Sequence, residues 1–378
     1  MVLFSPNKAE QMYITPDSYN HSREIFLKDL PRINNFLPKV QHTSFRISET
    51  DDLTIDLILS NPELHENLLF LTTGLHGIEG FLGSIMMQLF INEFLPHLDP
   101  EKTGILLVHC INPSGMHRHY RTNQSNVDLN RNFISDFSAM KRSNPDYQKM
   151  DGYFNPKKPV KSEWLTKFEF IFQTLKWLFR VGPDGVRNAA LMGQYNDPSG
   201  MYFGGYDLQP ETKILMGIIQ SWIPIYEKTL HLDMHTGYGP RFQMTLVQAV
   251  SESMTSIDAQ NLFNVPNVAA STPEEFYKMN GEMSDFIYKL GKENNRKVYS
   301  AAFEFGTYGE GILQGARSLL TTIAGNQLTQ FNASHRNRCW VEKDYKELYF
   351  PSENKWLEKA IINGRQAFYG ILNAEGLI

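Results

Sequence analysis

The sequence predicts an α/β protein of three layers, in which helices cover both faces of a mostly parallel or mixed sheet. Short apolar segments typical of strands alternate along the 378 residues with segments of helical periodicity. Several apolar segments are nearly continuous, which indicates strands that are buried on both faces. The composition, 42% hydrophobic and 20% charged, is that of an ordinary globular protein and argues against disorder.

The expected elements follow one another in a regular order. Strands are predicted at residues 54–60, 67–74, 104–112, 229–237, 243–250 and 297–306. Helices are predicted at residues 80–95, 207–227, 273–294 and 354–373. The 378 residues are enough for one large α/β domain or two smaller ones, and the sequence contains neither an internal repeat nor an obvious linker.

Residues 136–190 interrupt this order, since they carry no strand signal. They are predicted to form a helical insertion within the domain. Apolar side chains recur there at helical spacing: Trp164, Phe168, Ile171, Phe172, Leu175 and Leu178. We expect this stripe to pack the helix onto the body of the domain. The alternatives are a cover over the active site, or a surface for a partner or a membrane.

Charge and targeting signals narrow the functional class. The net charge of -5 argues against a nucleic-acid-binding protein, which would present a broadly basic face. Neither a signal peptide nor a run of roughly 18 apolar residues is recognisable, so we expect a cytoplasmic protein without a membrane span. Cys110 lies in an apolar run and is expected to be a buried small hydrophobe, so no disulfide framework is implied.

The stretch "LTTGLHGIEGFLGS" (71–84) joins a predicted strand to a predicted helix through a glycine-rich turn that contains His76 and Glu79. Its glycines alone could serve the turn, and the spacing is not that of a dinucleotide site. However, ligands bind at the carboxyl ends of strands in open α/β sheets. Imidazole and carboxylate are both good ligands for Zn²⁺, and a catalytic zinc normally takes three protein ligands and keeps one position for water. The pair therefore requires a third ligand.

His235 is the best third ligand, because it falls at the end of the predicted strand in "HLDMHTGYG" (231–239). Strand alternation places His231, Asp233 and His235 on one face. Asp233 either orients a ligand or caps neighbouring backbone groups. His231 lies deeper in the strand and is expected to be a core histidine.

Glu304 is the candidate general base. It lies between two phenylalanines near the end of another buried strand, "AAFEFGTYGEG" (301–311). A carboxylate there is costly to bury unless it is paired or functional. Next to zinc it would accept a proton from water, whose pKa the metal lowers to about 7.

The segment "HRHYRTNQSNVDLNRNF" (117–133) follows the third predicted strand and is rich in turn-forming residues. It is either a basic surface loop or a binding loop. Arginine beside asparagine can make several directed hydrogen bonds to a carboxylate. A separate arginine could stabilise the oxyanion of a tetrahedral intermediate.

Four motifs in this order, "GLHGIEG", "VDLNRNF", "DMHTG" and "EFGT", resemble those of the zinc carboxypeptidases of the M14 superfamily. The branch that contains aspartoacylase and succinylglutamate desuccinylase is similar in the same motifs. The nearest likeness is to the uncharacterised DUF2817 family, whose glycine-rich pattern is matched by "GQYNDPSGMYFGG" (193–205). The resemblance extends over about residues 50–373 and implies that residues 1–378 form one domain with a mixed, roughly eight-stranded sheet.

The resemblance also implies a role for each motif residue. His76, Glu79 and His235 would bind one zinc ion per chain. Arg121 would polarise the scissile carbonyl and hold the oxyanion, with Arg118 as the alternative one turn away, and Glu304 would be the base and later the proton donor. A substrate carboxylate would be bound by Asn130 and Arg131. The phenol that closes over substrate in carboxypeptidases has four candidates here: Tyr202, Tyr206, Tyr238 and Tyr308.

Together these features predict a zinc-dependent hydrolase of an amide bond next to a free carboxylate. The favoured substrate is a small peptide cut at its C-terminal end, and the alternative is an N-acyl amino acid. An alternative of another class is a binding protein that kept the metal and lost catalysis. Glu304 argues against it, because a structural zinc would have a fourth protein ligand and no nearby base. The oligomeric state is left open.

Overall fold

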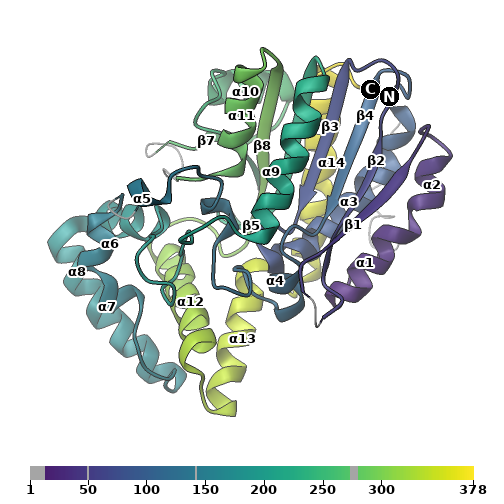
Figure 1. Cartoon of the computed structure of the whole chain (residues 1–378). Helices are drawn as coiled ribbons and strands as arrows, with labels where there is room; N and C mark the ends of the chain where they lie inside the picture. The colour runs from purple at the N-terminus through teal and green to yellow at the C-terminus, as the bar shows by residue number, and fades with distance from the viewer. Residues whose placement is uncertain (1–12, 49–50, 141–142, 273–279) are drawn as a thin grey trace.

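The computed structural model describes residues 13–48, 51–140, 143–272 and 280–378. Its centre is a mixed sheet of eight strands with helices on both faces (Figure 1). The predicted three-layer α/β class and the roughly eight strands are therefore confirmed. The strands are β1 (Gln41–Arg46), β2 (Thr54–Ser60), β3 (Asn67–Thr73), β4 (Thr103–His109), β5 (Lys228–Gly237), β6 (Met244–Gln248), β7 (Val268–Ala270) and β8 (Lys297–Gly306).

The strands lie in the order β1-β2-β4-β3-β5-β8-β6-β7. The central strands β4, β3, β5 and β8 run parallel, so their carboxyl ends meet at one edge. Strand β2 is antiparallel to both of its neighbours, and β6 is antiparallel to β8. All six predicted strands are present, whereas β1 and β7 are not predicted from the sequence. Strand β1 is polar and mostly exposed, and β7 has three residues, so neither has an apolar signal.

The sheet is buried on both faces. In β3, Leu69 and Leu71 pack in one core with helices α3, α10 and α14, while Leu68 and Phe70 pack in the opposite core with α9 and α11. This explains the continuous apolar runs of the central strands. The helices of the body are α1 (Tyr19–Lys28), α2 (Leu30–Asn34), α3 (Gly80–Glu93), α4 (Pro113–Arg118), α9 (Pro210–Trp222), α10 (Ser256–Phe263), α11 (Met283–Glu293), α12 (Ile312–Phe331), α13 (His335–Tyr349) and α14 (Asn354–Ala374).

Some predicted boundaries differ from the observed ones. The helix expected at 207–227 is shortened to α9, because Pro210 begins it and a 3₁₀ turn with Pro224 follows. Of the helix expected at 273–294, residues 273–279 lie outside the described residues, and α11 begins at Met283. Helices α12 and α13 are not predicted from the sequence. Among the described residues, no helix combines the length and apolar character needed to cross a bilayer.

The insertion is helical, as predicted, but its long helix packs on the domain through a different apolar stripe from the predicted one. It contains α5 (Phe137–Met140), α6 (Pro145–Lys149), α7 (Asp151–Phe154) and α8 (Glu163–Leu191), which is interrupted at Gly182. Helix α8 packs through Phe170, Trp177 and Leu178. Five of the six side chains predicted to pack are exposed by 56–68%: Trp164, Phe168, Ile171, Phe172 and Leu175. That prediction is wrong because α8 carries a second apolar stripe, and helical spacing alone does not tell which stripe is buried.

Candidate metal centre and catalytic site

The candidate site lies at the carboxyl ends of β3, β5 and β8. After β3 the chain passes Gly74, whose φ of 65° suits glycine, and a 3₁₀ turn at Gly77–Glu79 leads into α3. A Cβ on Gly77 would lie 2.2 Å from the backbone of Gly115, so only glycine permits this close approach to α4. The glycines therefore serve the turn, and the turn places His76 and Glu79 at the mouth of the sheet.

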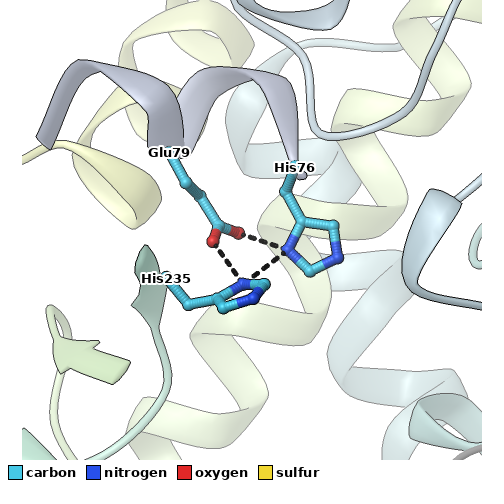
Figure 2. A group of neighbouring side chains, drawn as sticks. All are labelled: His76, Glu79 and His235. Atoms are coloured by element: carbon cyan, nitrogen blue, oxygen red, sulfur yellow. Dashed lines mark hydrogen bonds and ion pairs between the residues drawn. The ribbon is translucent and has the colours of Figure 1, made fainter. Parts of the chain in front are cut away.

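The three predicted ligands, His76, Glu79 and His235, converge (Figure 2). The Nδ1 atoms of His76 and His235 are 3.1 Å apart. Each also lies 3.0 Å from a carboxylate oxygen of Glu79. One ligand atom from each of the three residues falls within a span of 4.8 Å, and all three side chains are buried. The structure thus brings together two turn residues and one strand residue that are far apart in sequence.

Two aspartates orient the histidine rings. Asp128 lies 3.2 Å from Nε2 of His76, and Asp233 lies 2.5 Å from Nε2 of His235. If each Nε2–H donates to its aspartate, both Nδ1 atoms direct lone pairs at the point that Glu79 also faces. Such lone pairs repel one another unless a cation joins them, so the donor set fits a metal ion.

The charge of Glu79 also fits a metal ion at this point. Burial raises the pKa of this carboxyl group, but His76 and His235 beside it lower the pKa below its usual range. The backbone N–H of Thr236 also donates to the carboxylate at 3.0 Å. Glu79 is therefore held ionised, as a metal ligand must be.

His231 is a core residue, as predicted. It is fully buried, with its Nε2 3.0 Å from the hydroxyl of Thr72 and its Nδ1 2.7 Å from that of Ser300. The hydroxyl of Thr72 also donates to Asp233 at 2.6 Å. Asp233 therefore takes the orienting role among the two that the sequence leaves open.

Glu304 lies beside the ligands, because it is the register partner of His235 on the parallel strands β5 and β8. One carboxylate oxygen accepts a hydrogen bond of 2.9 Å from the backbone N–H of Tyr238. Burial and the nearby carboxylate of Glu79 raise the pKa of Glu304 to about 7. A carboxylate with such a pKa can take up and release a proton near neutral pH.

Arg121 also faces the site. Its Nη1 donates to Glu79 at 3.2 Å and its Nε donates to Asp128 at 3.0 Å. Of the two arginines that the loop offers for this position, Arg121 is the one that lines the cavity. Arg118 lies in α4 and donates to the carbonyl of Ser114.

The two predicted carboxylate-binding residues are separated by the structure. Asn130 lines the cavity, with its side-chain oxygen accepting from the backbone N–H of Met283 at 3.1 Å. Arg131 is fully buried, pairs with Asp128 and donates to the carbonyl of Leu191 at 2.6 Å. The expectation that the fork of Arg131 faces a substrate is therefore wrong for this arrangement. The reason is that Asp128, only three residues earlier on the same turn, engages it first.

The cavity above these groups has a volume of about 100 Å³. Of the four tyrosine candidates, Tyr202 and Tyr238 line it. Tyr206 instead donates to the carbonyl of Asn196, and Tyr308 donates to that of Asp344. Tyr349 and Glu282 are among the further lining residues that sequence reasoning misses. Tyr349 and Glu282 lie in segments without a recognisable motif, so no sequence signal points to them.

Comparison with known proteins places the chain in a family. The pattern of the family described as "Protein of unknown function (DUF2817)" matches residues 16–363. The chain belongs to this family. No curated protein sequence shows a significant match.

Similar solved structures share little sequence with this DUF2817 protein. Bovine thrombin-activatable fibrinolysis inhibitor, solved with tick carboxypeptidase inhibitor, is 17% identical over 88% of this chain and 98% of its own, with a TM-score of 0.46. Carboxypeptidase A from Helicoverpa armigera is 13% identical over 82% and 73%, with a TM-score of 0.43. An aspartoacylase family protein from Mesorhizobium loti is 14% identical over 78% and 67%, with a TM-score of 0.37.

The glycine-rich segment 193–205 of this DUF2817 protein packs against the loop that contains Asn126 and Arg131. The hydroxyl of Tyr195 donates to the backbone carbonyl of Arg131 at 2.7 Å. A Cβ on Gly193 would lie 2.5 Å from the side chain of Arg131, and its φ is 76°. The side-chain amide of Asn126 donates to the carbonyls of Pro198 and Gly200, each at 3.0 Å. The segment therefore fixes the loop that carries Asp128, Asn130 and Arg131.

Proposed function

We propose that this chain is a zinc-dependent hydrolase that cleaves an amide bond next to a free carboxylate. The observation that carries the proposal is the convergence of His76, Glu79 and His235, with Glu304 as the neighbour of His235 on the adjoining strand. Two imidazoles and one carboxylate are a usual ligand set for a catalytic zinc. Zinc bound there would polarise a carbonyl group and make a water molecule more acidic.

Glu304 and Arg121 would carry out the remaining chemistry. The carboxylate of Glu304 accepts a proton from the attacking water and then passes it to the departing amide nitrogen. Arg121 stabilises the negative charge that develops on the carbonyl oxygen. Its Nε and Nη1 contact Asp128 and Glu79, while Nη2 takes part in neither contact. Those two contacts hold the guanidinium in place before substrate binds.

A substrate carboxylate would meet Asn130, which lines the cavity beside Arg121. With the oxygen of Asn130 committed to Met283, its NH₂ group is the side-chain donor that remains. Arg131 acts from behind by binding Asp128. The free acid would therefore be bound by fewer charged side chains than the sequence motif predicts, because Arg131 does not face the cavity.

Two substrate classes use this machinery, a peptide cut at its C-terminal end and an N-acyl amino acid. The favoured class is the peptide, as in a metallocarboxypeptidase. The second candidate is the N-acyl amino acid, because its amide bond and free acid would use the same cavity residues, Glu304, Arg121 and Asn130. Assaying the zinc-loaded protein on both classes in parallel distinguishes them.

Metal binding is tested without activity. We expect one zinc per chain by elemental analysis, and we expect His235→Ala to lose it because one of three ligands is removed. The matched control is His97→Ala, which changes an exposed histidine outside the site. Full zinc content and full turnover in His235→Ala would refute the ligand set.

A further inference from the structure

The part of α8 before Gly182 has two opposite apolar faces. The inner one packs against α6, α7 and α12. The outer one, called here the outer apolar face, consists of six side chains that are exposed by 56–98%: Trp164, Phe168, Ile171, Phe172, Leu175 and Phe179. Figure 1 shows α8 at the edge of the molecule, remote from α1 and α2.

The outer apolar face is continuous along the helix. Its residues are spaced by one, three or four positions, so at 100° per residue they form one stripe about 100° wide. Scattered exposed apolar residues are normal, but a contiguous patch of large ones marks an interaction surface. Four of the six side chains are Trp or Phe, which bury the most apolar area when they are covered.

Basic side chains border the stripe. At 100° per residue, Lys167 falls on one side of it, where it pairs with Glu163, and Lys176 falls on the other side, with Arg180 beyond it. Lys176 and Arg180 both lie over the ring of Trp177, which keeps their charges close to the helix. Residues 157–187 contain seven basic and three acidic side chains, although the whole chain has a net charge of -5. The insertion is thus locally positive on an acidic protein.

We propose that the outer apolar face binds the surface of an anionic membrane, with α8 lying in the plane of the interface. A stripe rich in Trp, Phe and Leu with lysines along its borders is typical of helices that insert one face at the boundary of headgroups and acyl chains. The flanking Lys176 and Arg180 can reach lipid phosphates while their stems stay against the apolar surface. This inference is independent of the metal site.

A second copy of the chain fits the outer apolar face less well. Two copies joined through it would bring equal positive flanks together, and like charges across an interface disfavour association. An anionic lipid surface is instead complementary to the flank that carries Lys176 and Arg180. Helix α8 ends at Leu191, which lines the cavity, so one interrupted helix connects the outer apolar face to the candidate site.

Sedimentation with vesicles tests the proposal on the full chain. The parent should co-sediment with vesicles of phosphatidylcholine and phosphatidylserine, but much less with phosphatidylcholine alone, and added salt should weaken binding. Phe168→Ser with Phe172→Ser and Phe179→Ser should abolish binding. Lys176→Gln with Arg180→Gln should weaken it by at least about tenfold, since each basic residue contributes about 1 kcal/mol near such a surface.

The matched control is Ile257→Ser with Tyr369→Ser, which removes apolar side chains that are 70% and 62% exposed on α10 and α14. It should bind like the parent. The proposal is overturned if the parent ignores anionic vesicles, if the triple phenylalanine variant still binds, or if neutral vesicles are bound equally well. It is also overturned if the parent is a dimer that the triple variant converts to a monomer, because the face would then be a subunit interface.

Discussion

Replacing Asp128 by asparagine should weaken both the fold and the metal site. The carboxylate of Asp128 is fully buried and is shared by His76, Arg121 and Arg131. Burial raises the pKa of Asp128, but the two arginines and His76 lower it well below its usual range, so the group is an anion in the folded protein. Asparagine has nearly the same shape and no charge, so it leaves two guanidinium groups without this shared counter-ion.

The substitution should lower both the stability of the fold and the affinity for zinc. Removing one partner of a buried ion pair costs about 3–5 kcal/mol, a large share of the ~5–15 kcal/mol by which a typical protein is stable. Loss of the carboxylate that orients a histidine ligand lowers metal affinity about 10–100-fold. Urea unfolding of the metal-free proteins gives the first quantity, and competition with a chelator for zinc gives the second.

Asp233→Asn is the matched control. Asp233 orients His235 and accepts from Thr72, and within the described residues it pairs with no arginine or lysine. This variant should lose zinc affinity to a similar extent but only about 1–3 kcal/mol of stability, the cost of a disturbed buried hydrogen bond. Equal unfolding free energies for the two variants would refute the role assigned to the arginine pair. A parent-like zinc affinity in Asp128→Asn would refute its role in orienting His76.

Glu304→Gln should keep zinc and fold but lose turnover by about 10²–10⁴-fold, because glutamine cannot accept the proton; parent-like turnover would exclude Glu304 as the base. In the parent, kcat/KM should fall as the pH falls through the pKa of Glu304, because the protonated carboxyl group cannot accept a proton. That pKa is about 7 without a metal, and a bound cation, which offsets the charge of Glu79, would lower it. Asn130→Ala should reduce the preference for a free acid over its carboxamide by roughly 10–150-fold, since a hydrogen bond to a charged group contributes about 1.5–3 kcal/mol. Arg131→Lys should lower stability and keep that preference; the reverse result would show that the fork reaches the substrate.

The sequence predicts the centre of this protein well and its periphery poorly. Central parallel strands are buried on both faces, so β3, β5 and β8 have continuous apolar runs that are easy to recognise. Their ends meet at one edge, which is why His76 and His235 could be paired across more than 150 positions of sequence. Strand β1 lies at the sheet edge with most of its side chains exposed, and it has no such signal.

Within the site, the sequence identifies residue types but not their competition for partners. The sequence predicts that Arg131 binds a substrate, because arginine next to asparagine suits a carboxylate. The same reasoning applies to any nearby acid, and Asp128 is an acid one turn earlier. Which of the two anions the arginine meets depends on burial, and burial depends on the segment 193–205, which covers the loop.

The outer apolar face of α8 illustrates the same limit. Periodicity shows that one side of a helix is apolar, but the position of α6 and α7 decides which side they cover. Only the folded chain shows which side of α8 stays uncovered, and that uncovered side is the one that we propose contacts a membrane surface.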